Sequence, residues 1–213
     1  MRHADLAEMA YEISRPAGDY ASRRARRESV RSGLLMLVML LGIAAALLAL
    51  RLHHPAAFAL PLVAFALLAG LLGDRRSKRA GPWSLGAQSE IAVGDVLDDL
   101  RCDGFVVMHD FEQSGEGNVD HLVSGPTGVF MIETKRSGYG ERDLKKARRQ
   151  AAKLHGELGT WITPVICLDR RDQKPFRHDR VWIVGRSYLC EWIGAQRNHA
   201  ANVERVARFA GTL

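Results

Sequence analysis

Three charged residues stand within two runs that are otherwise typical of buried strands. The segment NVDHLVSGPTGVFMIETKRSG (Asn118–Gly138) has two apolar runs joined by a Gly-Pro turn, yet it carries Asp120, Glu133 and Lys135. Strand interiors disfavour charge, and two neighbouring carboxylates repel each other unless a cation joins them. Mg²⁺ takes oxygen ligands and commonly binds through one or two carboxylates, water and phosphate. With a lysine to orient an attacking water, this set has the equipment of metal-assisted phosphodiester hydrolysis.

The period of a strand decides which of these side chains can meet. Side chains alternate across a strand, so Glu133 and Lys135 share one face of the second strand. A turn centred near Pro126 places Asp120 opposite Ile132 or Glu133, where Cβ atoms lie within about 5.5 Å of each other. The pattern predicts that two carboxylates and an ammonium converge at one end of a sheet. An ordinary ion pair between Lys135 and either acid at a sheet edge is the alternative.

The same segment and its surroundings resemble a known family. The matching residues are GAQSE (Gly86–Glu90), the segment Asn118–Gly138 and Gln150. Together they resemble the NERD (nuclease-related) domain family of the PD-(D/E)XK, restriction-endonuclease-like superfamily, over roughly residues 84–170. The resemblance implies a mixed sheet flanked by helices, and cleavage of DNA that depends on a divalent metal.

The resemblance also implies a role for each matching residue. Asp120 and Glu133 correspond to the acids that bind Mg²⁺ or Mn²⁺, and Lys135 to the catalytic lysine. Glu90 corresponds to an acid in the preceding helix that reaches the metal through water, and Gln150 to a polar residue of the following helix. Glu90 could equally be a solvated helix residue, and Gln150 a boundary residue beside the apolar stripe of its helix.

Basic residues crowd the helix that follows the hairpin. The stretch RDLKKARRQAAK (Arg142–Lys153) has six basic residues and one acid. This face could contact the phosphates of a nucleic acid, or it could simply be solvated, as most runs of charge are. The residues of that face are Arg142, Lys145, Lys146, Arg149 and Lys153.

Periodicity predicts the elements that position these residues. A helical period over Ser84–Arg101, with Ser84 as its N-cap, precedes three strands. Because side chains alternate along a strand, His121 should point away from the face that carries Asp120. The order of helix, three strands, helix and strand indicates an α/β fold with a mixed sheet. The expected strands are Phe105–Phe111, the two of the hairpin, Trp161–Asp169 and Arg180–Gly185, and the expected helices are Glu141–Gly159, Ser187–Ala195 and Ala200–Ala210.

Two uncharged apolar runs precede this domain. Residues 33–50 and 55–73 are each long enough to cross a hydrocarbon core as a helix, and residues 51–54 leave only a tight connection. Basic residues are concentrated before the first run and after the second, which favours a transmembrane hairpin with both termini cytoplasmic. The helical spacing of apolar residues from Leu6 to Ile13 permits an amphipathic helix at the membrane surface, with a loosely ordered tail as the alternative.

Charge separates the chain into segments. Residues 1–80 have 12 Lys and Arg against 6 Asp and Glu, whereas the remainder is balanced, so the net charge of +6 belongs to the membrane-flanking part. That excess indicates topology and attraction to anionic lipid rather than nucleic-acid binding by the soluble domain. The expected segments are a basic cytoplasmic tail (1–32), two spans (33–50 and 55–73), a juxtamembrane linker (74–83) and a NERD-like domain (84–213).

Three widely spaced cysteines, Cys102, Cys167 and Cys190, argue against a disulfide framework and a zinc site. No small-molecule cofactor is implied. We therefore expect a membrane-tethered nuclease that uses Mg²⁺ or Mn²⁺, with DNA as the substrate that the resemblance favours. The alternative is a noncatalytic membrane protein that uses the nuclease-like fold to bind nucleic acid or protein.

Overall fold

The computed structural model describes residues 15–52, 56–113, 115, 117–196 and 206. The chain divides into two compact units. The helical unit comprises Ala21–Ser84. The globular unit comprises two stretches of the chain, Met1–Tyr20 and Leu85–Leu213. The amphipathic helix expected within residues 1–14 and most of the helix expected at 200–210 lie outside the described residues.

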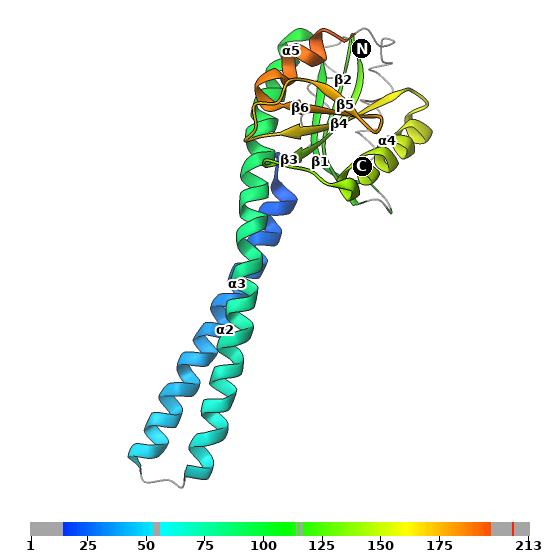
Figure 1. Ribbon diagram of the computed structural model, residues 1–213. Helices are drawn as coiled ribbons and strands as arrows, with labels where there is room; N and C mark the ends of the chain where they lie inside the picture. The colour runs from blue at the N-terminus through cyan, green and yellow to red at the C-terminus, as the bar shows by residue number, and fades with distance from the viewer. Residues whose placement is uncertain (1–14, 53–55, 114, 116, 197–205, 207–213) are drawn as a thin grey trace. The chain divides into compact units, whose positions relative to one another are not determined.

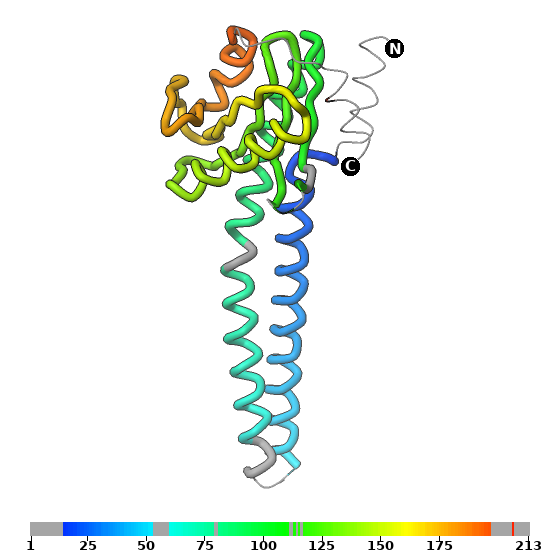
Figure 2. Tube along the Cα trace, turned by 90° about the vertical axis from the view of Figure 1, so that its right-hand side faces the viewer, coloured from blue at the N-terminus to red at the C-terminus, as the bar shows by residue number. Residues whose placement is uncertain are grey.

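Two helices make up the helical unit. They are α2 (Asp19–Arg51) and α3 (Ala56–Asp98), which lie side by side in Figure 2. Small residues allow the close approach, since a Cβ built on Gly42 would be 3.0 Å from the Cβ of Ala66. The Ser32 hydroxyl donates a 2.9 Å hydrogen bond to the carbonyl oxygen of Gly73.

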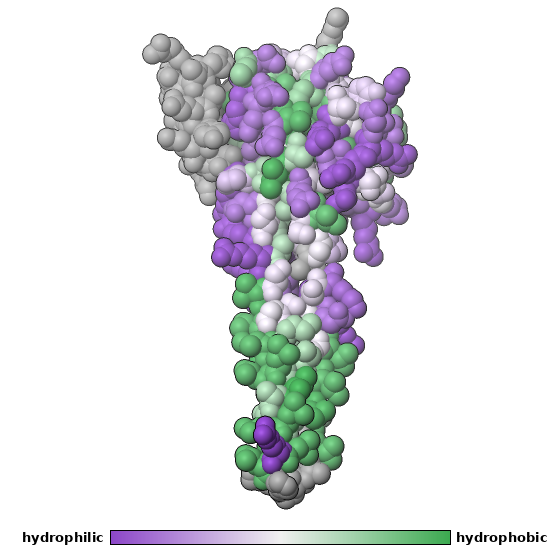
Figure 3. All heavy atoms as spheres, turned by 90° about the vertical axis from the view of Figure 1, so that its left-hand side faces the viewer, coloured by the Kyte–Doolittle hydropathy of each residue, from purple (hydrophilic) through white to green (hydrophobic). Residues whose placement is uncertain are grey.

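The face of the helical pair seen in Figure 3 is largely apolar in its lower part, apart from one hydrophilic patch near the connection between the helices. Among the described residues, α2 is the one helix whose length and apolar composition would let it cross a membrane, and little of its apolar stretch is buried. The second expected span, 55–73, starts at a residue outside the described part of the chain, and its described residues belong to α3.

The expected helix start at Ser84 is wrong, because α3 runs without interruption through that position and through residues 74–83. The Ser84 hydroxyl donates to the carbonyl oxygen of Gly81 at 2.8 Å, a bond made inside a helix rather than at its start. Packing explains the continuation, since the guanidinium of Arg24 lies 4.5 Å from the ring centroid of Trp83. Tertiary contacts of this kind outweigh a local Gly-Pro breaker signal.

The globular unit contains a mixed six-stranded sheet in the order β1-β2-β3-β4-β6-β5 (Figure 1). The first three strands are antiparallel, β3, β4 and β6 are parallel, and β5 is antiparallel to β6. The α/β class and the mixed sheet are confirmed. The strands are β1 (Val106–Gln113), β2 (Gly117–Gly125), β3 (Gly128–Lys135), β4 (Ile162–Leu168), β5 (Phe176–His178) and β6 (Val181–Gly185).

Helices cover both faces of this sheet. The helix α4 (Glu141–Leu158) connects β3 to β4 and buries its apolar stripe against one face, together with Val129 and Met131 of β3. The opposite face, with Phe130 and Ile132, packs against the last turns of α3 and against α5 (Leu189–Gly194). The helix expected at 187–195 is shorter than predicted, because its first residues form a 3₁₀ turn, Arg186–Tyr188.

A two-residue turn sets the register of the β2–β3 hairpin. Gly125 pairs with Gly128, so only Pro126 and Thr127 connect the strands, as a tight hairpin requires. Gly128 has a φ of 135°, which favours glycine. The Thr127 hydroxyl donates to the carbonyl oxygen of Ile193 at 2.8 Å and ties the turn to α5. This turn sets the pairing of the two strands as far as His121 and Ile132.

Candidate active site

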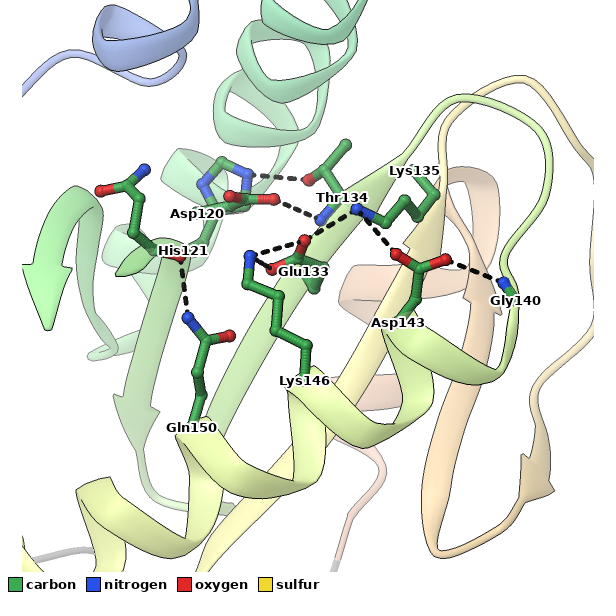
Figure 4. A network of polar contacts seen from close by, with 10 residues as sticks. Asp120, His121, Glu133, Thr134, Lys135, Gly140, Asp143, Lys146 and Gln150 are labelled. Carbon is green, nitrogen blue, oxygen red and sulfur yellow. Dashed lines mark hydrogen bonds and ion pairs between the residues drawn. The ribbon is translucent and has the colours of Figure 1, made fainter. Parts of the chain in front are cut away.

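The acids of the hairpin meet where the β2–β3 ladder ends. The last regular pair recorded on this side is His121 with Ile132. Beyond it, a carboxylate oxygen of Asp120 accepts a 2.7 Å hydrogen bond from the backbone N–H of Thr134 (Figure 4). Asp120 is 7% exposed and Glu133 is 2% exposed. The hairpin therefore buries two carboxyl groups at the end of β3, as the alternation predicts.

Two lysines neutralise Glu133. The Nζ of Lys135 lies 2.8 Å from its Oε1, and the Nζ of Lys146 contacts both oxygens, at 2.9 and 2.7 Å. Lys135 also lies 3.3 Å from Asp143, whose other oxygen accepts the N–H of Gly140 at 2.8 Å. Burial alone would lower the pKa of Lys135, but the charge and hydrogen bond of Glu133 raise it above its usual value. Lys135 therefore stays charged at neutral pH.

Gln150 projects from α4 toward β2 (Figure 4), a position that the resemblance implies for it. Its side chain is fully buried, and its Nε2 donates a 2.8 Å hydrogen bond to the carbonyl oxygen of Asn118 in β2. This bond fastens α4 to the strand two residues before Asp120. Any catalytic contribution of Gln150 stays a prediction.

Glu90, in the globular part of α3, belongs to the same electrostatic cluster. Burial, followed by the negative charges of Asp110 and Glu133, raises the pKa of Glu90 to about 7. Burial, followed by the charges of Glu133 and Glu90, raises the pKa of Asp120 well above its usual value. The site therefore contains more negative charge than its lysines balance, which is the condition that favours a bound cation or a proton.

Thr134 is held from the other face of the sheet as well. Its hydroxyl lies 3.1 Å from Nε2 of His121, and Nδ1 of His121 lies 2.8 Å from Nδ1 of His109. His109 in turn reaches Asp98 of α3 at 3.1 Å. Burial, and then the charge of His109, lower the pKa of His121 well below its usual value, so His121 is neutral. His121 points away from the acids, as expected, and it supports the strand that carries them.

The basic residues of α4 divide between two environments. Lys146 enters the site, whereas Lys145 pairs with Glu141 at 3.0 Å and is 55% exposed. Arg149 is exposed and Lys153 is half-buried. Contact of Lys145, Lys146, Arg149 and Lys153 with nucleic acid stays a prediction.

Sequence reasoning missed two members of this network, Asp143 and the role of Lys146 at Glu133. A signal for both exists in the helical period. Asp143, Lys146 and Gln150 are spaced three and four residues apart, which places them on one face of a helix. With that face turned toward β3, the three side chains line the site together (Figure 4).

The donor set suits a hard divalent cation. Among the described residues, no three His, Cys, Asp or Glu side chains are placed so that they could hold a metal ion. The oxygen donors at hand are the carboxylates of Asp120 and Glu133, and Mg²⁺ commonly binds proteins through only one or two carboxylates. Burial, and then the charges of Glu133 and Glu90, raise the pKa of Asp120, and a bound cation would offset these effects. Lys146 would have to leave at least one oxygen of Glu133 for a metal to bind there.

Comparison with known proteins agrees with the resemblance seen in the sequence. Residues 85–169 match the family model of NERD, the nuclease-related domain. No curated protein and no solved structure matches the chain. The matched range includes Glu90, Asp120, Glu133, Lys135 and Gln150, which supports the NERD family for the globular unit and suggests a nuclease-related function.

Proposed function

We propose that this protein is a membrane-tethered nuclease that hydrolyses phosphodiester bonds with Mg²⁺ or Mn²⁺, with DNA as the favoured substrate. The observation that carries the proposal is the buried pair of acids, Asp120 and Glu133, beside a charged Lys135, within a region that matches a nuclease-related family. Perturbed carboxyl groups that gather around a lysine are typical of catalytic sites.

Each side chain has a part in the proposed reaction. Asp120 and Glu133, with the carbonyl oxygen of Thr134, would hold the metal. The metal, when bound, supplies a water of lowered pKa and neutralises charge on the phosphate. Lys135, as a charged lysine, would orient the attacking water and stabilise the charge that develops on the phosphate. Glu90 would reach the metal through a water, and its pKa of about 7 suits it to accept a proton from that water.

A second candidate function has an observation in its favour. Glu133 is already neutralised by Lys135 and Lys146, which is the pattern of a structural ion-pair network. The fold would then serve as a noncatalytic module that binds nucleic acid or another protein. The excess negative charge around Asp120 and Glu90 favours the nuclease.

The tether in this proposal is a transmembrane hairpin with two spans, residues 33–50 and 55–73, and with the globular unit in the cytoplasm. The apolar, little-buried surface of α2 and the basic residues that flank the two runs support it. Cysteine introduced at His53 should react with an impermeant thiol reagent from outside the cell, and cysteine introduced at Ser77 should not. Labelling at Ser77 alone would reverse the orientation.

The nuclease itself is tested with the full-length protein in detergent, incubated with labelled DNA and RNA with and without Mg²⁺ or Mn²⁺. Asp120→Asn and Glu133→Gln should abolish both cleavage and the rise in melting temperature that the metal produces by binding the folded state. Lys135→Ala should retain metal binding and lose cleavage, and Lys174→Ala, at an exposed lysine, is the matched control. A structural ion-pair network predicts no metal effect on melting, together with destabilisation by Lys135→Ala.

A further inference from the structure

A concave site separate from the acids lies in the globular unit, at the other end of β4. It is a cavity of about 320 Å³ between the later turns of α4, the start of β4 and the β5–β6 hairpin. The residues that line it include Arg148, His155, Trp161, Arg177 and Arg180. A volume of this size is in the range of small-molecule and nucleotide subsites.

An exposed tryptophan forms one wall of this cavity. Trp161 is 64% exposed, although an indole ring is among the costliest side chains to leave in water. Its ring packs edge-on against His155 of α4, with ring centroids 6.2 Å apart. His155 is oriented in turn by a 2.7 Å contact between its Nδ1 and the carbonyl oxygen of Thr160. The ring is therefore held in a defined position with much of its surface open.

The β5–β6 hairpin brings arginines to the opposite wall. His178 pairs with Val181, so Asp179 and Arg180 form the two-residue turn, and both have left-handed φ values of 47° and 64°. Such turns favour glycine or asparagine, and holding two other residues there costs conformational energy. A 2.6 Å ion pair from Arg148 of α4 to Asp179 holds the turn in place.

Two cationic side chains at this wall are left available to a ligand. Arg177 and Arg180 are exposed. Within the described part of the chain no acidic partner contacts either of them, because Asp179 pairs with Arg148 instead. The cavity therefore combines an open aromatic face with two guanidinium groups, and aromatic stacking with phosphate neutralisation is how proteins bind single-stranded nucleic acid.

We infer that this cavity binds single-stranded nucleic acid, with a base stacked on Trp161 and adjacent phosphates on Arg177 and Arg180. A duplex hides the faces of its bases, so it could not use the indole ring. The register places Ile162, next to Trp161, opposite Val129, four residues before Glu133. At about 3.3 Å per residue the cavity lies about 13 Å from the acids along the strands.

This inference goes beyond the proposed nuclease, because binding at the cavity needs neither a metal nor cleavage. The test therefore uses the full-length protein in detergent with EDTA present. A labelled single-stranded thymidine oligomer is titrated and its fluorescence anisotropy is followed. Trp161→Leu should weaken binding by about 5- to 100-fold, whereas Trp161→Phe, which keeps an aromatic face, should retain most of it.

The arginines have a separate signature. Replacing both, with Arg177→Gln and Arg180→Gln, should reduce the slope of log affinity against log salt by about 1.4, since each phosphate contact to a single strand contributes about 0.7. Trp83→Leu, which removes another partly exposed tryptophan, is the matched control and should leave affinity unchanged. Thermal melting of each variant checks that the fold is retained.

Several outcomes would overturn the inference. In the first, the Trp161→Leu variant binds the oligomer as tightly as the original protein does. In the second, a duplex binds as tightly as the single strand and depends on Trp161 to the same degree. In the third, a polyglutamate peptide binds more tightly than the oligomer and displaces it. The last would assign the cavity to an acidic protein partner. The two proposals are tested independently. If the protein does not cleave nucleic acid, the binding experiment still decides whether the cavity binds it. Loss of binding in Trp161→Leu says nothing about cleavage of short substrates at Glu133.

Discussion

Replacing Glu90 with glutamine should stabilise the protein at alkaline pH and do much less at acidic pH. The pKa of Glu90 rises from 4.5 to about 7 on folding, through burial and the charges of Asp110 and Glu133. A carboxyl group with a raised pKa binds its proton more tightly in the folded state. Stability therefore falls as the pH rises from 4.5 to about 7, and the full cost is present above that window.

The size of the effect follows from the shift. A change of about 2.5 pKa units corresponds to roughly 3 kcal/mol at full ionisation, of which roughly 2.5 kcal/mol develops between pH 5 and pH 8. Glu90→Gln removes the titration, so its advantage over the original protein should grow by about that amount across the interval. For a folded unit of this size, that is a difference of about 10 °C in melting temperature.

The assay is thermal unfolding of the full-length protein in detergent at pH 5 and pH 8, without divalent metal. Glu157→Gln, at an exposed position of α4, is the control and should behave alike at both pH values. If Glu90→Gln changes the melting temperature equally at the two pH values, or lowers it more at pH 8, Glu90 is not in a buried acidic cluster and the electrostatic reasoning fails.

Two further predictions concern the neighbouring acids. Lys146→Met frees Oε2 of Glu133, while Lys135 still contacts Oε1. Mg²⁺ should therefore raise the melting temperature more than in the original protein, whereas Lys145→Met should not alter the metal effect. An unchanged metal titration in both variants would show that Lys146 does not compete for the site. Asp120→Ala leaves the N–H of Thr134 without its acceptor and should lower the unfolding free energy by about 1–3 kcal/mol, measured by chemical denaturation. Asp120→Asn keeps an oxygen at that position and should cost less. Equal losses in the two variants would mean that this hydrogen bond contributes nothing to stability.

The convergence of Asp120, Glu133 and Lys135 could be predicted because it depends only on local rules. The strand period of two and a two-residue turn determine which side chains share a face and which lie opposite. The family resemblance added Glu90 and Gln150, which the structure places beside these residues. The apolar stripe of α4 was equally predictable from its helical period.

Other features could not be predicted from the sequence, because they depend on contacts between distant segments. The position of Lys146 over Glu133 is set by where α4 crosses the sheet. The passage of α3 through a Gly-Pro pair depends on packing against α2, which a local breaker rule ignores. The strand β5 consists of three exposed residues, so it shows no alternation of apolar and polar side chains.

The helix α4 serves three surfaces at once, and this restricts how the protein can change over evolution. Its apolar stripe packs on the sheet, Asp143 and Lys146 contact Lys135 and Glu133, and Arg148 and His155 line the cavity beside Trp161. Inserting or deleting one residue between these positions would turn one end of the helix by about 100° relative to the other. Side chains at one end of α4 would then no longer face the part of the protein that they now contact. Divergence in α4 is therefore confined to substitution, and its length is expected to be inherited unaltered while the surrounding loops vary.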